Sequence, residues 1–173
     1  DFKFITSGRG IQTRAGDLLH NVVHLPTRAV YLYRSQDAGK TWTVNPTPVK
    51  PGDESKVVEL SDGSLMVNSR VGNDYRWVHR STDGGDTWES EKEFQLPDPR
   101  CNAAIIRYTS TKDGYAKDRL LFSNAGSQSG RENLTIRISY DEGHTWSAGK
   151  VVNPGPSAYS SLTILANGDI GVF

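Results

Sequence analysis

The chain has 173 residues, enough for about one domain, and its 20 basic and 20 acidic residues give a net charge of zero. This balance offers no electrostatic basis for binding nucleic acid or a membrane surface, and no apolar run is long enough to predict a membrane span. Cys101 is the only cysteine, so no internal disulfide can form, and its apolar surroundings indicate a core residue. The four histidines show no metal-ligand spacing, so we expect no metal site and no cofactor.

Short β-strands separated by turns are predicted along the whole chain, and no amphipathic helix of useful length is found. The first strands are predicted over 1–13 (punctuated by glycines), 17–24, 29–34 and 41–44, followed by a proline-rich connection over 45–52. The next four are predicted over 56–60, 65–70, 75–80 and 87–91, with a connection over 96–99. A third set is predicted over 101–108, 120–123, 134–139 and 145–151, with a connection over 154–156, and a last pair over 161–165 and 170–173.

Four-stranded units repeated at this length are typical of β-propeller blades. The chain is therefore predicted to be all-β, with three four-stranded antiparallel blades and half of a fourth. A closed propeller needs about four to eight blades. Because residue 173 falls inside a predicted strand, we interpret 1–173 as a fragment of a single propeller domain, whose remainder is one of its partners.

One motif, Ser-x-Asp-x-Gly-x-Thr-Trp, occurs three times, at 35–42, 81–88 and 139–146. The copies start 46 and 58 residues apart (81 − 35 and 139 − 81). Each copy follows a strand-forming run. Its Asp-x-Gly centre is typical of a hairpin turn, because Asp accepts backbone N–H bonds and Gly adopts positive φ. We therefore interpret Asp37, Asp83 and Asp141 as turn-forming residues rather than catalysts, and expect each Trp to fill a gap between sheets.

Strand counting places a second group of polar residues away from these turns. Because successive strands reverse direction, the three repeated motifs share one rim of the propeller, and the loops between second and third strands share the opposite rim with the connections between blades. The candidate site residues on that opposite rim are Glu54, Arg70, Arg131 and Tyr159. Ligands of propellers commonly bind at one mouth of the central channel, so this convergence indicates a binding or catalytic site.

Each candidate also has a structural interpretation. Arg70 could be a solvated charge at a strand end, and Arg131 could pair with Glu132 in its loop. Glu54, with Asp53 beside it, could be a turn acid, and Tyr159 an ordinary half-buried tyrosine. The functional interpretation depends on all four residues sharing one rim.

Several segments resemble bacterial-type sialidases (neuraminidases), in which the repeated motif is the Asp-box. Segment 54–70 is similar to the part that carries the catalytic glutamate and the second arginine of the family's triad, 16 residues apart (70 − 54). Segments 123–134 and 156–162 are similar to those with the third arginine and the tyrosine nucleophile, and 10–12 resembles an early-blade signature. The resemblance implies the middle to later part of a six-bladed catalytic propeller. The first arginine and an aspartate acid/base would lie upstream, and a further glutamate just after Phe173.

The resemblance also implies a reaction, the release of terminal sialic acid from glycans, glycoproteins or glycolipids with retention. Arg70 and Arg131 would bind the sugar carboxylate, which would repel a carboxylate nucleophile, so a neutral tyrosine suits this substrate. Glu54 would take the proton of Tyr159 as a covalent sialyl-enzyme forms. By the same resemblance we expect an enzyme that is secreted, periplasmic or on the surface of a bacterium.

Two alternatives remain open. A non-catalytic Asp-box propeller could bind glycans or proteins, but it would not need a base and a tyrosine side by side. A trans-sialidase would use the same residues as a hydrolase.

Overall fold

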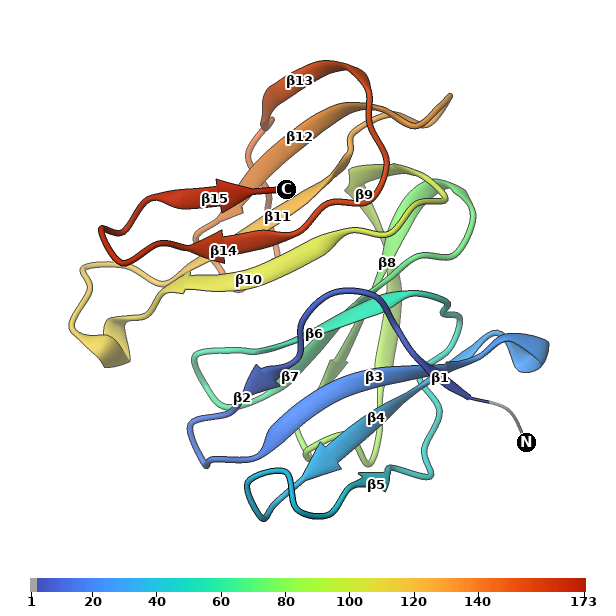
Figure 1. The fold of residues 1–173 in the computed structure, drawn as a ribbon, viewed down its shortest axis with the longest axis vertical. Helices are drawn as coiled ribbons and strands as arrows, with labels where there is room; N and C mark the ends of the chain where they lie inside the picture. The colour runs from blue at the N-terminus through green and yellow to red at the C-terminus, as the bar shows by residue number, and fades with distance from the viewer. Residues whose placement is uncertain (1–2) are drawn as a thin grey trace. The chain divides into compact units, whose positions relative to one another are not determined.

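The computed structural model describes residues 3–173, which form an all-β fold of consecutive antiparallel sheets (Figure 1). Within this range the helical segments are two short 3₁₀ turns, η1 (Leu25–Thr27) and η2 (Thr111–Asp113). No helix in the described part of the chain is long and apolar enough to cross a membrane. The chain forms two compact units, one of residues up to Val71 with Trp77–Lys92, the other of Gly72–Arg76 with Glu93–Phe173.

The first sheet has five strands because the predicted strand over 1–13 is interrupted. Its strands are β1 (Phe4–Ile5), β2 (Ile11–Gln12), β3 (Leu18–His24), β4 (Ala29–Ser35) and β5 (Thr43–Val44). Both β1 and β2 pair antiparallel with β3. Gly8 adopts a φ of +103°, and a Cβ on Gly10 would lie 2.5 Å from the carbonyl oxygen of Leu19. The glycines therefore explain the break, while residues 1 and 2 of the predicted strand lie outside the described residues.

The second sheet runs in sequence order, and its last strand is longer than predicted. Its strands are β6 (Ser55–Glu59), β7 (Leu65–Ser69), β8 (Asn73–Ser81) and β9 (Glu89–Pro99). Residues 96–99, expected to be a connection, continue β9. Proline cannot donate to a ladder but is tolerated on an edge strand, and β9 is the edge of this sheet. The prediction of a connection over 96–99, which rested on its prolines, was therefore wrong.

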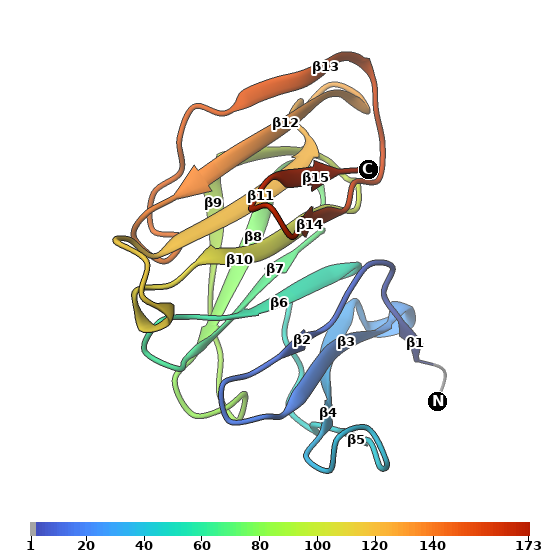
Figure 2. The same cartoon turned by 60° about the vertical axis from the view of Figure 1, so that its left-hand side comes forward.

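The third sheet is again four strands in sequence order, and a strand pair follows it (Figure 2). The strands are β10 (Ala104–Thr109), β11 (Arg119–Ala125), β12 (Glu132–Ser139), β13 (Lys150–Pro156), β14 (Leu162–Ile164) and β15 (Ile170–Val172). The strand expected over 145–151 begins only at Lys150, and the predicted connection over 154–156 belongs to it, with Pro156 opposite Glu132. Like β9, β13 is an edge strand. The prediction of three blades and half of a fourth is confirmed, with the first strand of the first blade divided into β1 and β2.

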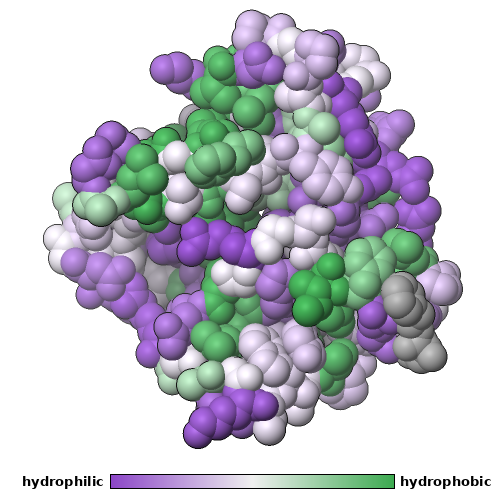
Figure 3. Space-filling view, in the orientation of Figure 1, coloured by the Kyte–Doolittle hydropathy of each residue, from purple (hydrophilic) through white to green (hydrophobic). Residues whose placement is uncertain are grey.

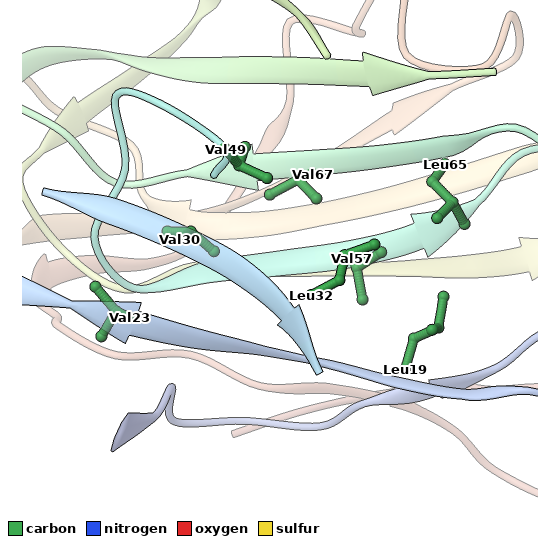
Figure 4. Packing of buried hydrophobic residues seen from close by; sticks show 8 residues of the cluster. All are labelled: Leu19, Val23, Val30, Leu32, Val49, Val57, Leu65 and Val67. Carbon is green, nitrogen blue, oxygen red and sulfur yellow. The ribbon is translucent and has the colours of Figure 1, made fainter. Parts of the chain in front are cut away.

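Aliphatic side chains from neighbouring sheets form the core of each unit. In the first unit they come from β3, β4, β6, β7 and the segment before β6, and the cluster is Leu19, Val23, Val30, Leu32, Val49, Val57, Leu65 and Val67 (Figure 4). The core of the second unit comprises Ala104, Ile106, Leu121 and Leu162. Burying one Val or Leu side chain stabilises a fold by about 1.5–3 kcal/mol. Hydrophilic and hydrophobic side chains are interspersed on the surface drawn in Figure 3, as expected for strands with alternating burial.

The three Asp-boxes form the same hydrogen-bonded turn. In the second copy, Asp83 Oδ1 accepts from Ser81 Oγ (2.7 Å) and Thr87 N (2.9 Å), and Asp83 Oδ2 from Thr87 Oγ1 (2.6 Å). Asp37 and Asp141 make the equivalent bonds. The residue after each Asp is left-handed, with φ of 58°, 75° and 60° at Ala38, Gly84 and Glu142. The interpretation of these aspartates as turn-forming residues is confirmed.

Candidate functional site

Glu54 and Arg70 face each other across the β6–β7 ladder. Glu54 precedes β6 and Arg70 follows β7, and the pairing of Ser55 with Ser69 places the two opposite each other. Their backbones continue the ladder, since Arg70 N donates to Glu54 O (3.2 Å). Their side chains form an ion pair between Arg70 Nη1 and Glu54 Oε2, and only 15% and 10% of the two side chains are exposed. Arg70 is therefore not a solvated strand-end charge.

The backbone before β6 is fixed on both sides of Glu54. Asp53 Oδ1 accepts from Glu54 N (2.8 Å), while Asp53 N donates to Arg70 O (3.0 Å). A Cβ at Gly52 would lie 2.7 Å from a methyl group of Val30, so glycine is needed at that position. Asp53, which no sequence pattern singled out, thus fixes the backbone on either side of the candidate base.

Arg131 and Tyr159 are neighbours in the second unit. The guanidinium carbon of Arg131 lies 5.8 Å from the centre of the Tyr159 ring, within the range of a cation–π interaction. The carbonyl oxygen of Arg131 accepts from Ser157 N (2.9 Å), which ties the start of β12 to the segment before β14. Tyr159 is 46% exposed, so its phenol is accessible to solvent.

The loop before Arg131 is ordered by its own polar contacts. Glu132 accepts hydrogen bonds from the hydroxyl groups of Ser127 (3.2 Å) and Ser129 (3.4 Å). Arg131 Nη2 instead donates to the carbonyl oxygen of Arg100 (3.2 Å). The alternative in which Arg131 simply pairs with Glu132 is not what the structure shows.

The Asp-boxes and the candidate site residues lie at opposite ends of their strands. Arg131 directly precedes β12, and the box residue Asp141 follows its last residue. β12 has eight residues, and at roughly 3.3 Å per residue it separates them by about 26 Å. Likewise Arg70 precedes β8 and Asp83 follows it. Arg70 and Arg131 therefore each lie at the opposite end of a strand from an Asp-box aspartate.

Each unit brings two of the four candidates together: Glu54 with Arg70 in the first, Arg131 with Tyr159 in the second. A carboxylate, two guanidinium groups and a phenol are the chemistry of anion recognition combined with proton transfer and nucleophilic attack. Among residues 3–173, no group of three or more His, Cys, Asp or Glu side chains could hold a metal ion.

Comparisons with known proteins relate this arrangement to sialidases. Residues 2–172 match the family described as BNR repeat-like domain. The chain is similar to a sialidase of Micromonospora viridifaciens, with 42% identity over 98% of this chain and 28% of the relative. The fold is similar to the Hadza microbial sialidase Hz136, with a TM-score of 0.84, 31% identity and coverage of 99% of this chain and 35% of that chain.

A third similar structure is an intramolecular trans-sialidase from Ruminococcus gnavus, with a TM-score of 0.77, 27% identity and coverage of 99% of this chain and 39% of that chain. The chain thus spans well under half the length of each of these three proteins. With three Asp-box turns, consecutive four-stranded sheets and a family match along nearly its whole length, the chain belongs to the BNR repeat-like family and is a segment of the bacterial sialidase type.

Proposed function

We propose that residues 1–173 are part of the catalytic propeller of an exo-α-sialidase, which removes terminal sialic acid from glycans, glycoproteins or glycolipids. In this proposal Tyr159 is the nucleophile, Glu54 its base, and Arg70 and Arg131 bind the substrate carboxylate. The rest of the propeller would supply the acid that protonates the leaving group. We expect the enzyme to be secreted, periplasmic or on the surface of a bacterium.

One observation carries the proposal: each of the four side chains lies beside another of the four. Glu54 and Arg70 form an ion pair, and Arg131 lies over the ring of Tyr159. The similarity to a sialidase at 42% identity extends over all four positions, since it covers 98% of the chain. A propeller that only binds glycans would not need the acid and the phenol.

The proposed reaction follows from the charge of the substrate. Sialic acid carries a carboxylate on its anomeric carbon, and guanidinium groups bind such an anion through charge-assisted hydrogen bonds. A tyrosine hydroxyl is neutral at rest, with an ordinary pKa of about 10, so it approaches the anionic sugar without repulsion but needs a base. Glu54 would accept the phenolic proton as Tyr159 Oη bonds to the anomeric carbon and the bond to the leaving oxygen breaks.

The second half of the reaction restores the enzyme. A water molecule would attack the anomeric carbon and give its proton to the group that had protonated the leaving oxygen, while the bond to Tyr159 Oη would break and the phenol would regain its proton from Glu54. Two displacements at one carbon give retention of configuration.

A transferase is the second candidate function, supported by the similarity to the intramolecular trans-sialidase. The two activities share the tyrosyl intermediate and differ only in the acceptor, which is water in one case and a sugar hydroxyl in the other. Analysis of the product by mass spectrometry distinguishes them, because an intramolecular transfer yields an anhydro sugar one water lighter than free sialic acid.

The test is the release of sialic acid from an unactivated sialoside by the complete enzyme. Tyr159→Phe keeps the ring and removes the attacking oxygen, so we expect turnover to fall at least about 10³-fold, since a covalent route would be lost. Tyr140→Phe is the matched control, because Tyr140 is similarly exposed (56%) but lies in an Asp-box. Near-normal turnover in Tyr159→Phe would contradict the assignment.

A further inference from the structure

A fully buried ion pair lies in the same unit as Arg131. Arg76 in β8 and Asp98 in β9 are both 0% exposed, and Arg76 Nη1 lies 3.3 Å from Asp98 Oδ2. The guanidinium carbon of Arg76 is 5.9 Å from the centre of the Phe122 ring. Both charges belong to the second unit, the unit of Arg131 and Tyr159. A buried ion pair is weak as a source of stability, because its desolvation cost offsets the attraction, so its geometric effect is of more interest.

The pair and Asn124 together fix one short segment of backbone at both of its ends. Arg76 Nη1 donates to the carbonyl oxygen of Cys101 (2.8 Å). Asn124, also 0% exposed, donates through Nδ2 to the carbonyl oxygen of Pro97 (2.7 Å) and lies 3.5 Å from Asp98 Oδ1. Asp98 thus links the two anchoring side chains, and the segment 97–101 is held on either side of Arg100.

Arg100 has an unusual backbone conformation between these anchors. Its φ is +56°, in the left-handed region, which is unfavourable for a residue with a Cβ and persists only where the surroundings determine it. The carbonyl oxygen of Arg100 accepts the hydrogen bond from Arg131 Nη2 (3.2 Å). Arg131 itself is exposed, so this bond and the Tyr159 ring are what restrict its long, flexible side chain.

We propose that Arg76, Asp98 and Asn124 are positioning residues for Arg131. By fixing the segment 97–101 they direct the Arg100 carbonyl at the Arg131 guanidinium, which is thereby oriented before substrate arrives. A pre-oriented guanidinium binds a carboxylate more tightly, because the entropy of ordering it is lost during folding rather than during binding. The inference rests on the proposed function, in which Arg131 binds the substrate carboxylate.

The test uses the complete enzyme and two substitutions. Asp98→Asn keeps the shape but removes the charge, and Asn124→Ala removes the anchor of Pro97 while leaving the ion pair intact. We expect each substitution to raise KM for a sialoside about tenfold, because substrate binding must then also order the Arg131 side chain. We expect kcat to change less than about threefold. If Asp98→Asn fails to fold, Asn124→Ala alone decides.

The same substitutions are repeated in an Arg131→Ala background, where the positioning residues have nothing left to orient. The rise in KM should then disappear, and a rise that persists would overturn the inference. Glu142→Gln is the matched control, because it removes the Arg107–Glu142 ion pair of the same unit, at the Asp-box end. If the role of Asp98 is purely structural, Asp98→Asn should lower the melting temperature and leave KM unchanged, as we expect of Glu142→Gln, and that result would also overturn the inference.

A measurement made without substrate tests the positioning of Arg131 independently of the proposed function. The side-chain nitrogen resonances of Arg131 in the complete enzyme report its order directly. If wild-type enzyme releases no sialic acid, the proposed function fails, yet Asp98→Asn should still shift and broaden these resonances. Unchanged resonances in both Asp98→Asn and Asn124→Ala would overturn the positioning role whatever the activity.

Discussion

Glu54 and Arg70 form an ion pair, so the two residues do not act independently. Their ion pair and shared ladder mean that a change in either displaces the other. A guanidinium presents its donors in a rigid fork that matches a carboxylate, whereas an ammonium group is a point charge. In the proposed reaction, Arg70 would use this fork to contact both Glu54 and the substrate carboxylate.

Arg70→Lys should therefore weaken substrate binding although the charge is kept. We expect KM to rise by at least about tenfold, corresponding to the loss of one charge-assisted hydrogen bond. Steady-state kinetics of the complete enzyme measure this, with Arg107→Lys as the control at the Asp-box end of the second unit. Equal, small effects of the two substitutions would argue against a role of Arg70 in binding.

His79 makes stability depend on pH. It is 0% exposed in β8, its Nδ1 lies 2.7 Å from Ser90 Oγ, and burial lowers its pKa to about 4, against the opposing effect of the Pro51 carbonyl. Between the unfolded pKa of about 6.5 and the folded value, the unfolded chain binds a proton that the folded chain does not. Stability should thus fall as the pH is lowered through this window, by about 3 kcal/mol in all.

His79→Gln should flatten this dependence. We expect its melting temperature to fall less than that of the wild type between pH 7 and pH 5, because the titrating group is gone. Parallel curves for His79→Gln and wild type would show that other groups govern the acid response.

The sequence predicted the four candidate residues because all lie where strands begin or end, and strand counting fixes those positions. Glu54 and Arg70 meet through simple ladder register, which follows once the turn over 60–64 is placed. The anchors of Arg131 could not be found in this way. Arg76, Asp98 and Asn124 come from three strands with no characteristic spacing, and a buried arginine cannot be distinguished from an exposed one by sequence pattern.

Among the elements, each Asp-box turn joins the third and fourth strands of its blade and is held by the same set of hydrogen bonds. Their hydrogen bonds lower the pKa of Asp37 to about 2, with the Thr41 hydroxyl as the largest cause. The pKa of Asp141 is also lowered, since its bonds to Thr145 and Ser139 outweigh the opposing effect of burial. Because a lowered folded pKa favours the charged form, these turns lose stability as the pH falls from about 4 through the folded pKa.

Asp141→Ala should destabilise the turn between β12 and β13 without affecting catalysis. It removes acceptors for Thr145 and Ser139, and the loss of such a turn acceptor typically costs about 1–2 kcal/mol. We expect a lower melting temperature with unchanged KM, measured on the same preparation of complete enzyme. A marked rise in KM would contradict the separation of the Asp-boxes from the proposed site.

Turns were predicted better than strand ends. The turn residues Asp and Gly act through local hydrogen bonds and positive φ, which the sequence shows directly. The bounds of β9 and β13 depend instead on their place at sheet edges, where prolines are tolerated, and this place is decided by the tertiary fold.

For the whole molecule, the proposed reaction requires groups that belong to each of the two units and to the rest of the propeller. Glu54 and Arg70 lie in one unit, Arg131 and Tyr159 in the other. The proposed acid and a further arginine would come from outside residues 1–173. The isolated chain should therefore release no sialic acid under conditions in which the complete enzyme is active. Turnover by the isolated chain would show that these additional groups are not required.

The most direct test of the central claim is the identity of the residue that forms the covalent intermediate. The complete enzyme is treated with a fluorinated sialic acid analogue, whose electron-withdrawing fluorine slows hydrolysis of the intermediate, and the labelled peptide is located by mass spectrometry. We expect a label on Tyr159, formed more slowly in a Glu54→Gln variant and absent in Tyr159→Phe. A label on any other residue would contradict the claim.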